Sequence, residues 1–299
     1  MKLRIGTRRS RLALAQAEEV AHALNAHGID SELVPMTTSG DRGADPSSDP
    51  AGMKGLFVAE IVRALQEGEV DLAVHSAKDL PAHDPEGVVV AAVPERADPF
   101  DVLLTRGGDL EDGHVVGTSS VRRRAQLLRS RPAISVREVR GNVDTRLARM
   151  DAGDVDALVL AAAGLRRLGL MPPHATPLPL DEMVPAPGQG ALAVQARAGD
   201  ERILDLVKQL DHPRSRLAYE AERALVLRLG GDCSLPLGAY AERREEGVRL
   251  LAVVIRPDGS DLAWAQVEAP TPDQAAGEAA KTLLAGGAAA ILADAGAGR

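Results

Sequence analysis

VVGTSSVRR, the segment at residues 115–123, decides how this chain folds. A short apolar run is followed by a glycine and by small polar residues at 118–120, and a helix-like segment begins at Val121. This strand–turn–helix step is typical of an α/β sheet, and the small polar residues are suited to capping the helix. Exposed N–H groups at the start of a helix attract an anion, and Arg122 and Arg123 add two full positive charges beside them.

The same step recurs on both sides of this segment. Upstream, the pattern predicts strands at 3–6, 31–36, 72–75 and 88–93 and helices at 10–27 and 55–68. From residue 115 onward it predicts strands at 115–116, 135–139 and 157–160 and helices at 121–129 and 145–152. Such alternation is typical of a mostly parallel sheet.

Two joints interrupt the alternation. The first, residues 94–99, is rich in proline and charge, and the second, residues 171–187, is rich in proline and returns the chain. The sequence therefore predicts two similar α/β domains with a hinge and a crevice between them. From about residue 213 the pattern changes to a helix at 215–229, strands at 248–255 and 262–268, and an alanine-rich helix at 272–293. This last region predicts a small α+β third domain.

Composition limits the class of protein. The chain has 299 residues, 45% of them hydrophobic and 26% charged, which predicts two or three globular domains. A net charge of -8 and only 2% aromatic residues disfavour nucleic-acid binding. One cysteine excludes an intrachain disulfide and a cysteine-based zinc cluster, and no metal is expected. With no signal-like start and no bilayer-length apolar stretch, we expect a cytoplasmic protein without membrane contact.

Further arginines follow predicted strands. Arg8 comes after the strand at 3–6, Arg140 and Arg146 flank GNVDT, and Arg167 follows the apolar run at 157–164. The ends of parallel strands meet at one crevice, and arginine binds carboxylates and phosphates through a two-pronged fork. The arginines therefore predict a ligand with several carboxylates or phosphates. The alternative is ordinary capped helices with solvated arginines, as we expect for Arg124 and Arg129.

The segment HSAKDLP, residues 75–81, follows a strand of buried type. It places Ser76, Lys78 and Asp79 at the end of that strand. A carboxylate there can act as a general acid or base, or stabilise a developing cation, although a turn-capping aspartate gives the same pattern. We expect His75 to be a core histidine rather than a ligand.

Three loops leave two interpretations open. Cys233 lies in a glycine-rich loop, so its thiol is either reactive and modified or simply buried and inert. Gln189, in PAPGQGA at 185–191, either contacts a ligand or lies in a plain hinge turn. The polar stretch at 39–54 is either a lid over the crevice or a disordered insertion.

Taken together, these motifs resemble the porphobilinogen deaminase family, also called hydroxymethylbilane synthase. Each motif alone is weak, but all occur in the family's order over nearly the whole chain. The matching segments are GTRRS at 6–10, KGLF at 54–57, HSAKDLP at 75–81, GTSSVRR at 117–123, RGNVDTR at 140–146, AGLRRLG at 163–169, PGQGA at 187–191 and the loop around Cys233.

The resemblance implies a transferase of porphyrin and haem biosynthesis. Such an enzyme joins four porphobilinogen molecules head to tail, releases ammonia, and finally releases hydroxymethylbilane with water. It implies two α/β domains like those of periplasmic binding proteins, with a hinge, plus a small α+β domain that carries the cysteine. The implied domains are 1–94 with 190–210, then 95–189, then 213–299. A monomer with porphobilinogen as its small-molecule partner is implied as well.

The resemblance also implies roles for individual residues. Cys233 would hold a dipyrromethane cofactor through a thioether, and Asp79 would be catalytic, handling protons at pyrrole nitrogens and balancing charge as an azafulvene-type electrophile forms. The implied cofactor contacts are Lys78, Thr118, Ser120, Arg122, Arg123 and Gly164, the implied substrate contacts are Arg8, Ser10, Phe57, Ser76, Arg140, Arg146, Arg167 and Gln189, and Lys54 belongs to the lid.

Three positions depart from the family pattern. Pro50 and Ala59 stand where lysines are frequent, which leaves the lid contacts open. Asp232 stands where many members have glycine, and a carboxylate beside Cys233 should raise the pKa of its thiol. Two other classes of function remain to be weighed: a two-domain binding protein for an organic anion, and a nucleic-acid-binding regulator that uses Arg122 and its neighbours. The first has no need of Asp79 or Cys233, and the net charge disfavours the second.

Overall fold

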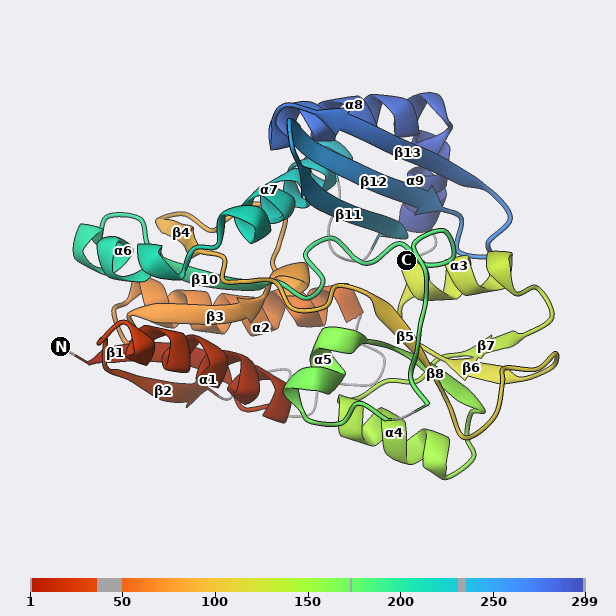
Figure 1. The fold of residues 1–299 in the computed structure, drawn as a ribbon, viewed down its shortest axis with the longest axis horizontal. Helices are drawn as coiled ribbons and strands as arrows, with labels where there is room; N and C mark the ends of the chain where they lie inside the picture. Colours follow the sequence, from red (N-terminus) through yellow and green to blue (C-terminus); the bar gives the residue numbers. More distant parts are fainter. Residues whose placement is uncertain (1, 37–49, 173, 231–234, 298–299) are drawn as a thin grey trace.

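The computed structural model describes residues 2–36, 50–172, 174–230 and 235–297. Three sheets organise the part of the chain that it describes, two with five strands and one with three (Figure 1). The helices lie over the faces of these sheets, and the three-stranded sheet belongs to the C-terminal region. Two α/β domains and a small C-terminal α+β domain are therefore confirmed.

The first sheet has the strand order β2-β1-β3-β10-β4. Helices α1 and α6 cover one face and α2 covers the other, so the aliphatic core lies on both sides of the sheet. The strands are β1 (Leu3–Arg8), β2 (Ser31–Met36), β3 (Leu72–Ser76), β4 (Val88–Ala92) and β10 (Leu192–Arg197), and the helices are α1 (Arg11–Ala26), α2 (Pro50–Gln66) and α6 (Glu201–Val207). Short 3₁₀ turns η2 (Ala77–Asp79) and η3 (Lys208–Leu210) follow β3 and α6.

The second sheet has the order β7-β6-β8-β5-β9. Helix α3 packs on one face, and α4 and α5 pack on the other. Its strands are β5 (Asp101–Thr105), β6 (Val115–Gly117), β7 (Ser135–Arg137), β8 (Ala157–Ala161) and β9 (Thr176–Pro177), and its helices are α3 (Val121–Ser130), α4 (Val143–Asp151) and α5 (Ala162–Arg167). The segment that opened the sequence analysis forms β6 and the start of α3, as predicted.

The expectation of mostly parallel sheets is confirmed, with one reversed strand in each five-stranded sheet. Strand β10 runs antiparallel to both of its neighbours, β3 and β4, and β5 runs antiparallel to β8 and β9. Both strands are the first to enter their sheet after the chain has crossed the hinge. They start beside the points where β3 and β8 end, since Leu192 pairs with Ser76 and Asp101 pairs with Ala161. A strand that enters a parallel sheet from this side must run against it.

The C-terminal domain packs its helices on one face of an antiparallel sheet. Its elements are α7 (Pro213–Arg228), β11 (Leu237–Arg244), β12 (Gly247–Ile255), β13 (Leu262–Ala269), α8 (Pro272–Ala285) and α9 (Ala288–Ala297). The prediction of one helix over 272–293 is wrong. The chain breaks between α8 and α9 at Gly286 and Gly287, and Gly287 has a φ of 93° that favours glycine.

A buried ion pair joins the hinge to this third domain. Arg96 in the first joint contacts Glu222 of α7 at 2.7 and 3.1 Å, and the Glu222 side chain is fully buried. Glu222 also accepts hydrogen bonds from the backbone N–H groups of Gly188 and Ala241, at 2.6 and 2.7 Å. One carboxylate therefore links both hinge segments and β11.

No helix within the described part of the chain has the length and apolar character needed to span a bilayer.

Candidate active site at the hinge

The hinge loop lies directly against the turn that carries Asp79. Gly188 has a φ of 74°, and a Cβ at this position would come within 3.0 Å of the Ala77 carbonyl carbon and of the Lys78 nitrogen. Only glycine allows the loop to approach this closely. Beside it, the Lys78 ammonium donates a hydrogen bond to Gln189 Oε1 at 3.5 Å. The turn after β3 is thereby fixed to the loop that returns from the second domain.

Gln189 connects groups from both α/β domains. Its side chain is fully buried, and its Oε1 accepts from Arg123 Nη2 at 3.4 Å as well as from Lys78. Its Nε2 donates to the carbonyl of Pro99 at 2.8 Å and to Asp101 Oδ1 at 3.0 Å. Because an ionised carboxylate only accepts, Asp101 fixes which end of the amide faces the two cations. Gln189 therefore joins the two α/β domains at the hinge through its side chain.

Asp101 was not singled out in the sequence. It opens β5, is fully buried, and contacts Arg122 Nη1 at 2.9 Å and Arg123 Nη2 at 2.7 Å. Burial would raise the pKa of Asp101, but the charges of both arginines, with hydrogen bonds from Arg122 and Gln189, outweigh burial and hold this pKa at about 2. The sequence feature that could have indicated Asp101 is an acidic residue at the start of the apolar run DVLLT.

Arg122 and Arg123 lie in the interior instead of on an open surface. They are 4% and 6% exposed, and they also donate to the backbone carbonyls of Val184, at 2.6 Å, and Val159, at 3.1 Å. Within the described residues, Arg122 Nε is buried and has no hydrogen-bond partner. Burial, together with the nearby charge of Arg123, lowers the pKa of Arg146 to about 10, which places a third cation in this region.

The small polar residues at the strand end cap the helix, as expected. Ser120 is the N-cap of α3 and accepts from the backbone N–H of Arg123 at 3.4 Å, and Thr118 accepts from the N–H of Ser120 at 3.2 Å. Ser10 has the same role in α1, where it accepts from the N–H of Ala13. Arg124 and Arg129 are exposed, as predicted.

The remaining predicted ligand contacts differ in their surroundings. Arg140 is exposed and contacts Glu138 at 2.7 Å, whereas Arg146 donates to the carbonyl of Gly141 at 2.7 Å. Arg167 is nearly buried and contacts Glu19 across the seam between the two α/β domains. Gly164 faces the same seam, where an added Cβ would lie 3.7 Å from Leu12.

Four further predicted residues lie on strands or helices of the first domain. Ser76 ends β3, and Arg8 ends β1. Lys54 and Phe57 lie within α2, but their side chains are not described. Cys233 and residues 39–49 of the lid expected at 39–54 lie outside the described residues, whereas residues 50–54 of that stretch form the start of α2 instead of a loop.

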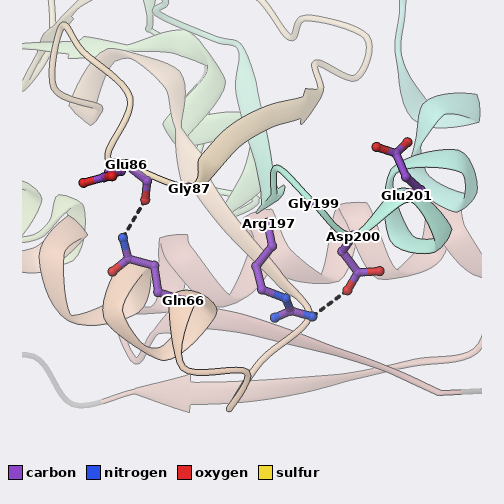
Figure 2. A pocket seen from close by; sticks show the side chains of 7 residues that line it. All are labelled: Gln66, Glu86, Gly87, Arg197, Gly199, Asp200 and Glu201. Carbon is purple, nitrogen blue, oxygen red and sulfur yellow. Dashed lines mark hydrogen bonds and ion pairs between the residues drawn. The ribbon is translucent and has the colours of Figure 1, made fainter.

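A surface hollow at the other end of the first sheet is separate from this site. It is lined by Gln66, Glu86, Arg197, Asp200 and their neighbours (Figure 2). The Arg197 guanidinium contacts Asp200 at 2.8 Å and donates to the backbone carbonyls of Leu65 and Val70. These contacts indicate a structural role for that arginine.

His75 is a core residue, as predicted. Its side chain is 7% exposed, and burial lowers its pKa to about 4, with the charge of Asp79 opposing that shift. The histidine is therefore neutral near pH 7, and Asp79 has an uncharged imidazole rather than a cation at this position.

The buried His75 should make stability depend on pH. Its pKa in the unfolded chain is near 6.5, so the unfolded state binds the extra proton between pH 6.5 and about 4. We expect the contribution of His75 to the free energy of unfolding to be fully present above pH 6.5. Near pH 4 the free energy of unfolding should be lower by up to about 3 kcal/mol. Urea unfolding from pH 7.5 to 4.5 measures this, and His75→Leu should flatten the curve. His22→Leu, at an exposed position, should not, and an equal slope in all three proteins would contradict the expectation.

Comparison with known proteins decides the family. Residues 3–205 match the family model "Porphobilinogen deaminase, dipyromethane cofactor binding domain", and residues 217–285 match "Porphobilinogen deaminase, C-terminal domain". The chain belongs to the porphobilinogen deaminase family. The resemblance drawn from the ordered motifs is confirmed, and so is the expected dipyrromethane cofactor, which the first family model names.

The relatives match over almost the whole chain. The porphobilinogen deaminase of Rubrobacter xylanophilus is 48% identical over 295 residues, which cover 97% of this chain and 96% of the relative. Those of Syntrophotalea carbinolica and Brevibacillus brevis are 46% and 44% identical, covering 97% and 98% of this chain and 95% and 97% of the relatives.

Among solved structures, the similar proteins include periplasmic binding proteins. The methionine-binding protein MetQ covers 70% of this chain and 89% of its own, with 12% identity and a TM-score of 0.44. The aliphatic sulphonate binding protein SsuA from Escherichia coli covers 76% and 70%, with 14% identity and a TM-score of 0.41.

Proposed function

We propose that the hinge site described above is where this chain joins four porphobilinogen molecules head to tail, with release of ammonia, to give hydroxymethylbilane. The evidence for this reaction is that the chain belongs to the porphobilinogen deaminase family. The observation that supports this place is the buried cluster of Arg122 and Arg123, which Gln189 links to the turn of Lys78 and Asp79. Porphobilinogen bears an acetate and a propionate, so each addition brings two more carboxylates to the cationic groups.

The residues present fit a dipyrromethane cofactor with carboxylate side chains. Arg122 and Arg123 bring two positive charges to the single carboxylate of Asp101, the charge of Arg146 acts on Arg123, and Arg122 Nε lacks a partner in the described part of the chain. An anionic group placed here would balance buried positive charge. When bound, the dipyrromethane supplies the pyrrole carbon from which the product is extended. Cys233 would hold it by a thioether, and its contacts would be Lys78, Thr118, Ser120, Arg122, Arg123 and Gly164.

Asp79 would act on the reacting part of the substrate. It follows Lys78 in the turn η2 and is partly buried, so its charge is screened less than at an open surface. As the bond between the aminomethyl carbon and nitrogen breaks, ammonia leaves and positive charge develops on the pyrrole. The Asp79 carboxylate stabilises that charge and exchanges a proton at the pyrrole nitrogen.

Around this centre, the other predicted residues would hold the carboxylates of substrate and growing chain. They are Arg8, Ser10, Phe57, Ser76, Arg140, Arg146, Arg167 and Gln189, with Lys54 in the lid. We propose the domain division 1–94 with 190–210, then 95–189, then 213–299, which agrees with the three sheets. We also propose a cytoplasmic monomer whose partner is porphobilinogen, with neither nucleic acid nor membrane as a partner.

The covalent cofactor gives the first test. Intact-mass spectrometry of chain expressed with a supply of porphobilinogen should show the polypeptide plus one dipyrromethane, and acid Ehrlich reagent should give a colour. Cys233→Ala should show the bare polypeptide and no colour. Because Cys233 is the only cysteine, thiol alkylation reports the unloaded fraction of the unmodified chain. Bare polypeptide weight after incubation with porphobilinogen would refute the proposal and favour a non-catalytic binding protein.

A further inference from the structure

An ion pair closes the seam between the two α/β domains next to the hinge. Helix α1 of the first domain and α5 of the second lie side by side there (Figure 1). Arg167 at the end of α5 donates from Nε to Glu19 Oε2 at 2.8 Å and from Nη2 to Glu19 Oε1 at 3.4 Å. Its Nη2 also donates to the carbonyl of Gly190 in the hinge loop at 3.2 Å. The two-pronged fork of Arg167 is thus already occupied by a carboxylate.

The two partners differ in their exposure to solvent. The Arg167 side chain is 7% exposed, whereas the Glu19 side chain is 42% exposed. The arginine therefore depends on a carboxylate partner, while the glutamate can return to water at little cost. A ligand carboxylate can take the same fork on Arg167 only if it replaces Glu19, because the guanidinium offers that edge once.

We propose that Glu19 is a specificity-determining residue, an internal carboxylate that occupies Arg167 until a carboxylate of the substrate or growing chain displaces it. The inference rests on the proposed function, in which Arg167 holds those carboxylates. The exchange replaces one carboxylate with another, so Arg167 keeps a partner throughout. A ligand without a carboxylate at this point cannot displace Glu19. Glu19 therefore weakens the binding of every ligand at the seam and selects for ligands that bring a carboxylate to Arg167.

The decisive variant is Glu19→Gln, which keeps the size of the side chain and removes its charge. We expect the KM for porphobilinogen to fall by about two- to fivefold, the range typical of a partly exposed ion pair, with kcat changed by less than about twofold. Glu19→Asp keeps the charge on a side chain shorter by one methylene group, so its KM should lie between those of Glu19→Gln and the unmodified chain.

Two matched controls separate this effect from general changes in charge or in the seam. Glu18→Gln removes the same charge one residue earlier on α1, where the side chain is exposed. Asp144→Asn breaks a second ion pair across the seam, in which Asp144 Oδ1 lies 2.6 Å from Arg11 Nη1, and leaves Arg167 with Glu19. Both variants should keep the KM of the unmodified chain.

The outcomes distinguish this inference from the proposed function. If the unmodified chain forms no hydroxymethylbilane, the function itself is refuted. If the chain is active but Glu19→Gln leaves KM unchanged or raises it, Glu19 is not a competitor and the inference alone fails. An equal fall in KM for Asp144→Asn would also overturn it, because loosening of the seam would then be the cause.

Discussion

Asp79→Asn is expected to lower kcat by about 10²- to 10⁴-fold, while the chain still folds and still carries its cofactor. The amide has nearly the shape of the carboxylate, so the turn Ala77–Asp79 and its contact with the hinge loop should survive. It cannot accept a proton, and it cannot balance the positive charge that develops as ammonia leaves. Loss of the Asp79 charge should therefore lower the rate of the reaction and leave attachment of the cofactor unchanged.

Three measurements on Asp79→Asn check this expectation: single-turnover release of ammonia, intact mass and urea unfolding. Asp84→Asn is the matched control, because Asp84 lies five residues further along and pairs on the surface with Arg223 at 2.9 Å. It should keep near-normal turnover. An Asp79→Asn chain that turns over within about tenfold of the unmodified rate would remove Asp79 from the chemistry. Normal unfolding with no bound dipyrrole would instead assign it to cofactor loading.

The sequence predicts local steps of this fold well, because their causes are local. Ser120 caps α3 and Ser10 caps α1, since a hydroxyl before a helix has a backbone N–H within reach. The direction of β5 and β10 could not be predicted in the same way. It depends on where the chain re-enters a sheet after crossing the hinge, and no periodicity within a strand records that.

The site shows the same division between local and long-range causes. Lys78, Arg122 and Gln189 were found because each stands at a strand end or in a glycine-rich turn. Asp101, which contacts both Arg122 and Gln189, was not found, because it is 21 residues from Arg122 and 88 from Gln189 in sequence, as their numbering shows. Its importance comes from two cations that the folded sheet brings to it. The break at Gly286 and Gly287 was visible in the sequence, but the alanine-rich pattern around it favoured one long helix.

Asp101→Asn is expected to destabilise the chain by about 3–5 kcal/mol and to leave most of it without cofactor. The substitution leaves Arg122 and Arg123 buried without the carboxylate that both contact. The new amide has one acceptor oxygen where the carboxylate had two, so its NH₂ group must face either the Arg122 guanidinium or the donors of Arg123 and Gln189. Asp154→Asn is the control, because Asp154 is exposed and pairs with Arg149 at 2.8 Å, so its loss should cost no more than about 1 kcal/mol.

The dependence on pH and a double variant make the Asp101 expectation sharper. The pKa of Asp101 is lowered from 3.8 to about 2, so its stabilising charge is fully present above pH 3.8 and is lost only as the pH falls toward 2. The difference in unfolding free energy between Asp101→Asn and the unmodified chain should therefore be constant from pH 5 to 8. Adding Arg122→Leu to Asp101→Asn removes an uncompensated buried cation, so the double variant should be more stable than Asp101→Asn alone. Strictly additive losses in urea unfolding would show that the arginine and the aspartate do not depend on each other, and the proposed dependence of the buried arginines on Asp101 would have to be abandoned.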